Sequence, residues 1–240
     1  MSQIVIARQF CGPPNSGNGG YVCGVLAKDI KGAATSVLRA PVPLDVHLHL
    51  ANDDAAVVLT DGDGGLVGRS DPAPDAELPQ PPAFPGPEAA REAGRRYQGL
   101  TTRFHPICFT CGTEREDGDG LRVFVGQVQG AAPGVVAGTW TPHAVFADAA
   151  GQVSTEVIWA ALDCPGYFAW VEKEGRHGAL LGTMTGEVVR RPKAGEETVV
   201  VAWPLERQGR KELAGVALFN ARGELMARAH QVWIVMGPRS

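Results

Sequence analysis

The chain has 240 residues, with 22 lysines and arginines against 26 aspartates and glutamates and a formal net charge of -4. Apolar residues make up 44% and charged residues 20%, as in an ordinary folded protein. The slight acidity argues against general nucleic-acid binding, because neutralising phosphates requires a basic surface. No apolar run has the roughly 18–20 residues that cross a bilayer, and the N-terminus does not look like a secretory signal. Five scattered cysteines do not make a disulfide scaffold, so we expect a cytoplasmic protein.

Prolines divide the chain. Seven of them lie between Pro72 and Pro87, and such a stretch lacks the backbone donors of a strand or a helix interior. We therefore expect a first domain over 1–72, a linker with a short helix over 73–103, and a second domain over 104–240. The alternative is a proline-rich surface loop inside one domain.

Elements follow in the same order on both sides of this linker. The first side has an apolar helix over 19–30, a strand with Arg and Pro over 38–44, and a hairpin over 57–69. After the linker we expect strands at 121–125 and 135–140, an apolar helix over 154–164, and strands at 182–190, 198–203, 212–219 and 226–235. A helix that is apolar nearly all round must be buried, so each helix is expected to lie against an antiparallel sheet in an α+β arrangement.

The two hairpins also share residues at one constant offset. The matches are Val57, Leu59, Gly64, Leu66 and Arg69 in the first hairpin with Val216, Leu218, Gly223, Leu225 and Arg228 in the second. Together with the common order of helix, strand and hairpin, they indicate an internal repeat. Chance similarity between two generic hairpins is the alternative.

Three stretches carry a family resemblance. Residues 18–27 are similar to a His-Gly-Gly helix start, with Asn18 in place of His. Residues 190–196 are similar to an Arg-Pro turn that ends in Gly and an acid, and residues 213–233 are similar to a final hairpin. In these features the chain resembles hotdog-fold proteins of the acyl-CoA thioesterase type. The resemblance implies a double hotdog, in which two curved antiparallel sheets, each wrapped on a central helix, pack as an intrachain pseudo-dimer.

The resemblance also implies where a site would lie. In thioesterases of the phenylacetate-pathway type, a carboxylate follows the His of the helix start by nine residues. Ser154 stands at that position in the second unit, and nine residues later comes Asp163, whereas the first unit has Ala27. Because such sites form between two units, Asn18 and its two glycines should face Asp163.

The opposite pseudo-site has lost its acid. It would combine residues 154–156 with Ala27, and only Glu156 could replace the missing carboxylate. We therefore expect one site per chain.

The residues of the expected site suit thioester hydrolysis. Free N–H groups at a helix start can polarise a carbonyl oxygen. Gly19 and Gly20 would allow close approach, and Asn18 can cap the helix. A buried Asp163 would have a raised pKa and could serve as base or nucleophile. The alternatives are a simple helix cap, and an acid at the end of a helix that stops near Pro165.

The remaining residues that we expect to contact substrate flank this centre. Thr183 and Thr185 would position water or substrate in the family manner, and the phosphates of a coenzyme A arm would meet basic side chains. The full expected set is Gly19, Tyr21, Thr183, Thr185, Arg190, Arg191 and Lys193. Structural strand threonines and a solvated basic turn are the alternatives.

A short segment with His105, Cys108 and Cys111 resembles half of a zinc site. No second ligand pair follows in the sequence, and a redox CxxC would need a thioredoxin-like context that is absent. We therefore expect this segment to be structural, with no bound metal and no cofactor apart from the coenzyme A of the substrate.

The predicted function is hydrolysis of a small or medium acyl-CoA thioester. The alternatives are a non-catalytic acyl-CoA or acyl-chain binding protein on the same fold and a hotdog hydratase or dehydratase. The hydratase reading is disfavoured because His143, His177 and His230 lie outside the helix starts. The expected partner is a small acyl-CoA, without nucleic acid or membrane, and exposed sheet edges would allow a homo-oligomer.

Overall fold

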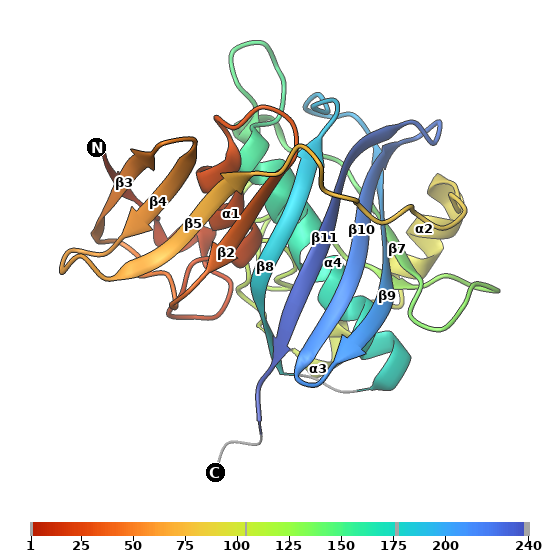
Figure 1. Ribbon diagram of the computed structural model, residues 1–240. Coiled ribbons are helices and arrows are strands. Elements are labelled where there is room, and N and C mark those ends of the chain that lie inside the picture. The colour runs from red at the N-terminus through yellow and green to blue at the C-terminus, as the bar shows by residue number, and fades with distance from the viewer. Residues whose placement is uncertain (1, 104, 176–177, 238–240) are drawn as a thin grey trace.

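The computed structural model describes residues 2–103, 105–175 and 178–237, so His177 lies outside the described residues. Eleven strands form one sheet in the order β1-β3-β4-β5-β2-β8-β11-β10-β9-β7-β6, with every neighbouring pair antiparallel. The helices α1 and α4 pack side by side against this sheet (Figure 1). The predicted antiparallel sheet on buried apolar helices is therefore confirmed. No helix among the described residues is long and apolar enough to span a membrane.

The elements of the first half are β1 (Ser2–Val5), α1 (Gly19–Ala27), β2 (Ala34–Leu38), β3 (His47–Asp53), β4 (Ala56–Thr60) and β5 (Leu66–Pro72). Two short helices follow, α2 (Pro87–Gly94) and α3 (Gly99–Thr102). The rest of the chain forms β6 (Gly126–Gln127), β7 (Val136–Trp140), α4 (Thr155–Glu174), β8 (Ala179–Val188), β9 (Thr198–Gln208), β10 (Lys211–Asn220) and β11 (Leu225–Val235).

The sheet has the same strand order on both sides of its centre. β2 pairs with β8 there, with Thr35 opposite Thr185. Outward from this junction come β5, β4 and β3 on one side and β11, β10 and β9 on the other. The predicted hairpins are confirmed as β4–β5 and β10–β11. The repeat in the sequence thus corresponds to a repeat in strand order.

Two predicted strands are wrong. The strand expected over 38–44 ends at Leu38, the last residue of β2, and the chain then runs as a loop to β3. Residues 121–125 form no strand, although their apolar side chains alternate as a strand's would. The N–H groups of Leu121 and Val123 instead donate to the carbonyls of Phe109 and Thr110, both at 2.8 Å. Residues 121–125 therefore run beside the irregular stretch that contains Phe109 and Thr110. That stretch supplies the carbonyl acceptors that a neighbouring strand would otherwise provide.

The helix α4 is longer than predicted. It continues through Pro165 and ends at Glu174, where Gly175 adopts a left-handed conformation. Proline has no N–H to donate to the carbonyl of Ala161, and its ring crowds that carbonyl. The prediction that the helix stops near Pro165 is therefore wrong, because surrounding groups compensate for this local defect.

Side chains bond to the carbonyls on either side of the one that Pro165 leaves without its helical donor. Thr110 Oγ1 donates to the Ala160 carbonyl at 2.7 Å, and Gln231 Nε2 donates to the Leu162 carbonyl at 2.8 Å and the Asp163 carbonyl at 3.0 Å. Thr110 and Gln231 are both completely buried. Donors from the loop and from β11 thus satisfy the disturbed turn and hold α4 on the sheet.

Two glycines set the distance between α1 and α4. A Cβ atom on Gly20 would lie 2.6 Å from both Asp163 Cβ and the Trp159 carbonyl oxygen. On Gly24 it would lie 2.5 Å from Glu156 Cα. The expectation that Gly20 leaves room for substrate is therefore wrong, because the space beside it is filled by α4.

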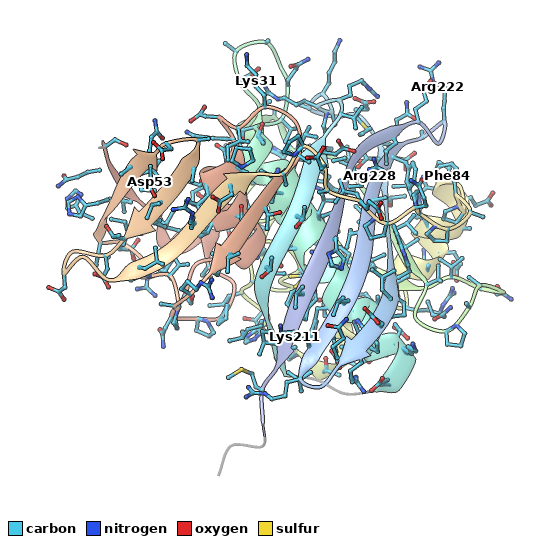
Figure 2. The ribbon with its side chains drawn as sticks, in the orientation of Figure 1. Lys31, Asp53, Phe84, Lys211, Arg222 and Arg228 are labelled. Carbon is cyan, nitrogen blue, oxygen red and sulfur yellow. The ribbon has the colours of Figure 1, made fainter. Side chains whose placement is uncertain are left out.

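The opposite face of the sheet is covered at one end by α2. Ala90 and Ala93 of this helix pack with Val199, Val201 and Ala217, which alternate along β9 and β10 with residues that face α4. Just before α2, the ring of Phe84 lies 5.4 Å from that of Phe219 (Figure 2). The segment expected to be a linker therefore adds a second, smaller apolar layer.

The substitution Gly24→Ala should destabilise the protein. The added methyl group meets the backbone of α4, which can yield only if the two helices separate. We expect the free energy of unfolding to fall by about 1–3 kcal/mol in urea titrations. Gly62→Ala is the matched control, because nothing lies within 4 Å of a Cβ there. Equal stability of the two variants would contradict the helix contact.

Candidate functional site

The structure brings Asn18, Gly20 and Asp163 together. Asn18 is the N-cap of α1, and its Oδ1 accepts a hydrogen bond from the Tyr21 N–H at 2.9 Å. Gly20 lies in the first turn of α1, directly against Asp163 in the middle of α4. Both polar side chains are almost completely buried. The start of one helix thus faces the carboxyl group of the other, while the roles assigned to these residues remain predictions.

The surroundings of the Asp163 carboxyl group disfavour its charged form. Its Oδ1 is buried and has no hydrogen-bond partner among the described residues. Burial raises the pKa of Asp163 to about 7, the Cys108 thiol adds to the rise, and the Gly20 N–H and the Asn18 side chain oppose it. A carboxyl group of this kind exchanges a proton near neutral pH, as a general base must.

Residues 105–112, here called the cysteine segment, cover this centre. Cys108 Sγ accepts a hydrogen bond from Asn18 Nδ2 at 3.7 Å. The Phe109 N–H donates to the Cys11 carbonyl at 2.7 Å, and the Phe109 ring packs edge-on against Phe10 at 5.0 Å. These contacts place the cysteine segment over the start of α1.

The remaining residues of the predicted helix start serve packing. Tyr21 stacks on Phe10 with 4.1 Å between ring centroids, and burial raises the pKa of its hydroxyl group. A Cβ on Gly19 would lie 3.1 Å from Leu181 of β8. Gly19 and Tyr21 therefore border the centre, with Tyr21 built into an aromatic cluster.

Thr183 and Thr185 face the other way. They flank Met184, which is completely buried in the core around α4. Because successive side chains of a strand point to opposite faces, the two threonines lie on the face away from Asp163. Thr185 Oγ1 instead lies 2.9 Å from Thr35 Oγ1 across the central strand pair. The prediction that they position water or substrate at Asp163 is therefore wrong.

The basic cluster lies in the loop that contacts the start of α4. Arg191 donates to Asp148 at 2.7 Å and to two backbone carbonyls of the loop before α4. Arg190 pairs with Glu196 at 2.9 Å, whereas Lys193 is exposed. Arg191 thus fastens two loops to each other, and Arg190 and Lys193 carry most of the charge that is accessible to a ligand.

The opposite pseudo-site contains no comparable centre. Ser154 is the N-cap of α4 but makes no capping hydrogen bond with its side chain. Glu156 lies against Gly24, and Ala27 is buried in the core. Among the described residues, Asp163 is therefore the buried carboxyl group that lies against a helix start.

Sequence reasoning missed one residue next to the centre. Cys164 follows Asp163 on α4, and its Sγ lies 3.6 Å from that of Cys108. Cys111 Sγ completes the group, with all three sulfur atoms within 4.8 Å of one another. Residues this far apart in sequence reveal their proximity only in the folded chain. The adjacency of Cys164 to Asp163 was the only available signal.

Two shallow cavities, of about 220 Å³ and 360 Å³, lie elsewhere. Arg122 and Trp140 line the smaller, and Lys31 and Asn52 line the larger. Neither is lined by Asp163, so neither leads directly to the buried carboxyl group.

Comparisons with known proteins identify the fold. No family model and no curated protein matches the chain. A candidate thioesterase from Novosphingobium aromaticivorans is 13% identical with a TM-score of 0.62, and the match covers 98% of this chain and 95% of that one. A hot dog fold protein of unknown function from Alicyclobacillus acidocaldarius is 11% identical with a TM-score of 0.63, and the match covers 99% of this chain and 93% of that one. The tesB protein of Mycobacterium avium subspecies paratuberculosis is 14% identical with a TM-score of 0.61, and the match covers 94% of this chain and 89% of that one. At these identities the likeness shows the fold alone, and the chain has the hotdog fold.

Two substitutions of Asn18 should distinguish the contribution of its capping oxygen to stability from that of its side-chain N–H bond to Cys108. Asn18→Ala removes the capping oxygen, so we expect a loss of about 0.5–2 kcal/mol in the free energy of unfolding. Asn18→Ser keeps a capping oxygen and should recover most of that loss, although it cannot donate to Cys108 Sγ as the amide does. Thermal and urea unfolding of both variants would test this, and equal losses would show that the cap contributes little.

Proposed function

We propose that the chain is an acyl-CoA thioester hydrolase built as a double hotdog. Its two units would span 1–72 and 104–240, with 73–103 between them and one catalytic centre at Asp163. The matching strand order on both sides of the β2–β8 junction supports the pseudo-dimer. The observation that carries the function is the buried Asp163 carboxyl group, without a partner for Oδ1, against the start of α1.

The proposed reaction uses both helices. A thioester carbonyl oxygen at the start of α1 would have to replace the Asp163 carboxyl group as the acceptor of the Gly20 N–H, whose donation is aided by the helix dipole. Asp163 would take a proton from water as the water oxygen bonds to the carbonyl carbon. Collapse of the tetrahedral intermediate then breaks the carbon–sulfur bond, and the proton passes to the departing thiolate. The products are a carboxylic acid and free coenzyme A.

Access to this centre requires the cysteine segment to move. Cys108 occupies the position next to Asn18, and Thr110 is bonded to the Ala160 carbonyl. A thioester could reach Gly20 only where these contacts open. The proposed enzyme therefore works through an open form in which the cysteine segment leaves the start of α1 and the middle of α4.

The closed centre favours a second candidate function. A protein that binds acyl-CoA without hydrolysing it needs no water beside Asp163, and the described structure leaves little room for one, because Asp163 is only 3% exposed. In that case Asp163 would be a structural acid between two helices. The experiment below separates the two functions.

The basic loop is proposed to bind the coenzyme A phosphates. Val153, which accepts a hydrogen bond from Arg191, lies ten residues before Asp163, or about 15 Å along a helix axis. An extended pantetheine arm is of similar length. Arg190 and Lys193 could then meet the phosphates while the thioester lies at Asp163.

The substitution Asp163→Asn tests the catalytic role. Asparagine keeps the shape but cannot take a proton, so we expect thiol release from a panel of short, long and aromatic acyl-CoAs to fall by about 10²-fold or more. Glu172→Gln, on the same helix but away from the centre, is the matched control and should keep full activity. Circular dichroism would verify that both variants are folded.

Other outcomes would redirect the assignment. Hydrolysis that survives Asp163→Asn would leave an enzyme but contradict Asp163 as its base. Absence of turnover in the unaltered protein, together with saturable acyl-CoA binding, would establish the binding function instead.

The phosphate role predicts a difference between two substrates. Replacing Arg190 and Lys193 with Gln should raise KM for an acyl-CoA by about 10-fold, because each charged hydrogen bond is worth about 1.5–3 kcal/mol before solvent weakens it. Hydrolysis of the matching acyl-pantetheine, which lacks the nucleotide phosphates, should not change. Lys211→Gln is the control, because Lys211 is a basic residue at the start of β10, outside the loop that holds Arg190 and Lys193 (Figure 2). Equal effects on both substrates would exclude phosphate recognition.

A further inference from the structure

Three buried thiols meet between the cysteine segment and α4. Cys108 and Cys111 come from the segment and Cys164 from the helix, and all three are free cysteines. Their sulfur atoms lie within 4.8 Å of one another, with Cys108 and Cys164 at 3.6 Å. The contact joins two parts of the chain that no sheet hydrogen bond connects.

The spacing suits a tetrahedral metal ion. Zinc bonds to thiolate sulfur at about 2.3 Å, so two sulfurs of a tetrahedral site lie about 3.8 Å apart. The separation of Cys108 and Cys164 is close to this value, and small side-chain rotations would bring Cys111 to it. A disulfide needs a sulfur–sulfur distance of about 2.0 Å, which only one pair could reach at a time.

Several hydrogen-bond donors converge on the sulfur atom of Cys108. The backbone N–H groups of Thr110 and Cys111 interact with its sulfur, and Asn18 Nδ2 donates to it at 3.7 Å. A turn that aims several donors at one sulfur is the arrangement that supports a metal-binding thiolate.

The described residues place no cationic side chain against the three sulfur atoms. Asp163, next to Cys164, has a buried Oδ1 without a partner. Among the described residues, no lysine or arginine donates a hydrogen bond to any of the three sulfur atoms. Arg115 does donate to a sulfur atom, but to that of Cys11, outside the cluster. A bound cation would supply the positive charge that thiolate ligands need when they are buried.

We propose that Cys108, Cys111 and Cys164 together bind one Zn²⁺ ion, with an oxygen ligand in the fourth position. The ion would fasten the cysteine segment to α4 directly over Asp163. Sequence alone predicted no metal because the third ligand lies on a helix far from the CxxC pair. This proposal does not depend on thioester hydrolysis, since binding of the ion by the three thiols requires no turnover.

Metal analysis tests the proposal directly. Protein produced with added Zn²⁺ and dialysed free of loose metal should retain about one Zn²⁺ per chain by mass spectrometry of the metal. Cys108→Ser and Cys164→Ser should each reduce this content about 10-fold or more. Cys23→Ser, a buried free cysteine outside the cluster, is the matched control and should retain the full content.

A second measurement covers variants that fail to fold. Chelator-stripped unaltered protein should bind Co²⁺ and develop the absorption of cobalt–thiolate charge transfer, which Zn²⁺ then removes by competition. Folded protein that retains no zinc and gives no such absorption would overturn the proposal. Peptide mapping that finds a Cys108–Cys164 disulfide in protein purified without reductant, at zinc content near zero, would overturn it as well.

Discussion

The close contact between α1 and α4 is the constraint on which the rest of the structure depends. Gly20 and Gly24 have no side chain to keep the helices apart, so the backbones meet where a Cβ atom would lie about 2.6 Å or less from its neighbours. The same approach lets β2 and β8 pair into one continuous sheet and aims the start of α1 at Asp163. Any side chain at these glycines would separate the helices and move the carboxyl group away from the N–H groups that face it.

The helix α4 contains three residues that an isolated helix would disfavour, and the sheet bonds to the turn that contains them. Pro165 removes a backbone donor, Gly166 adds flexibility and Asp163 buries a carboxyl group. Gln231 of β11 donates to two carbonyls of this turn and accepts a hydrogen bond from Trp233 Nε1 at 2.9 Å. A Cβ on Gly166 would lie 1.8 Å from Gln231 Oε1, so the glycine is what admits this side chain. The defect in the helix and the polar residue on the strand thus require each other.

The sequence indicated those features that depend on local pattern. Apolar periodicity located both central helices, and the Val-Leu-Gly-Leu-Arg repeat located both hairpins. It could not assign faces to Thr183 and Thr185, because the face of a strand is decided by whichever neighbour packs in the core, here Met184. It could not reveal Cys164 as the neighbour of Cys108, because that proximity arises only when the cysteine segment folds onto α4. Local rules therefore found the elements, and tertiary contacts decided which side chains meet.

The two proposals make competing demands on one small volume. Hydrolysis needs the cysteine segment to leave Asn18 and Gly20, so that a thioester can enter. A metal ion held by Cys108, Cys111 and Cys164 would instead bind that segment to α4 and keep Asp163 covered. Because ligand binding stabilises the state that contains the complete site, metal would shift the population toward the closed form. The thiol cluster would then oppose the reaction of the acid beside it, and the balance between open and closed forms would follow the availability of the ion.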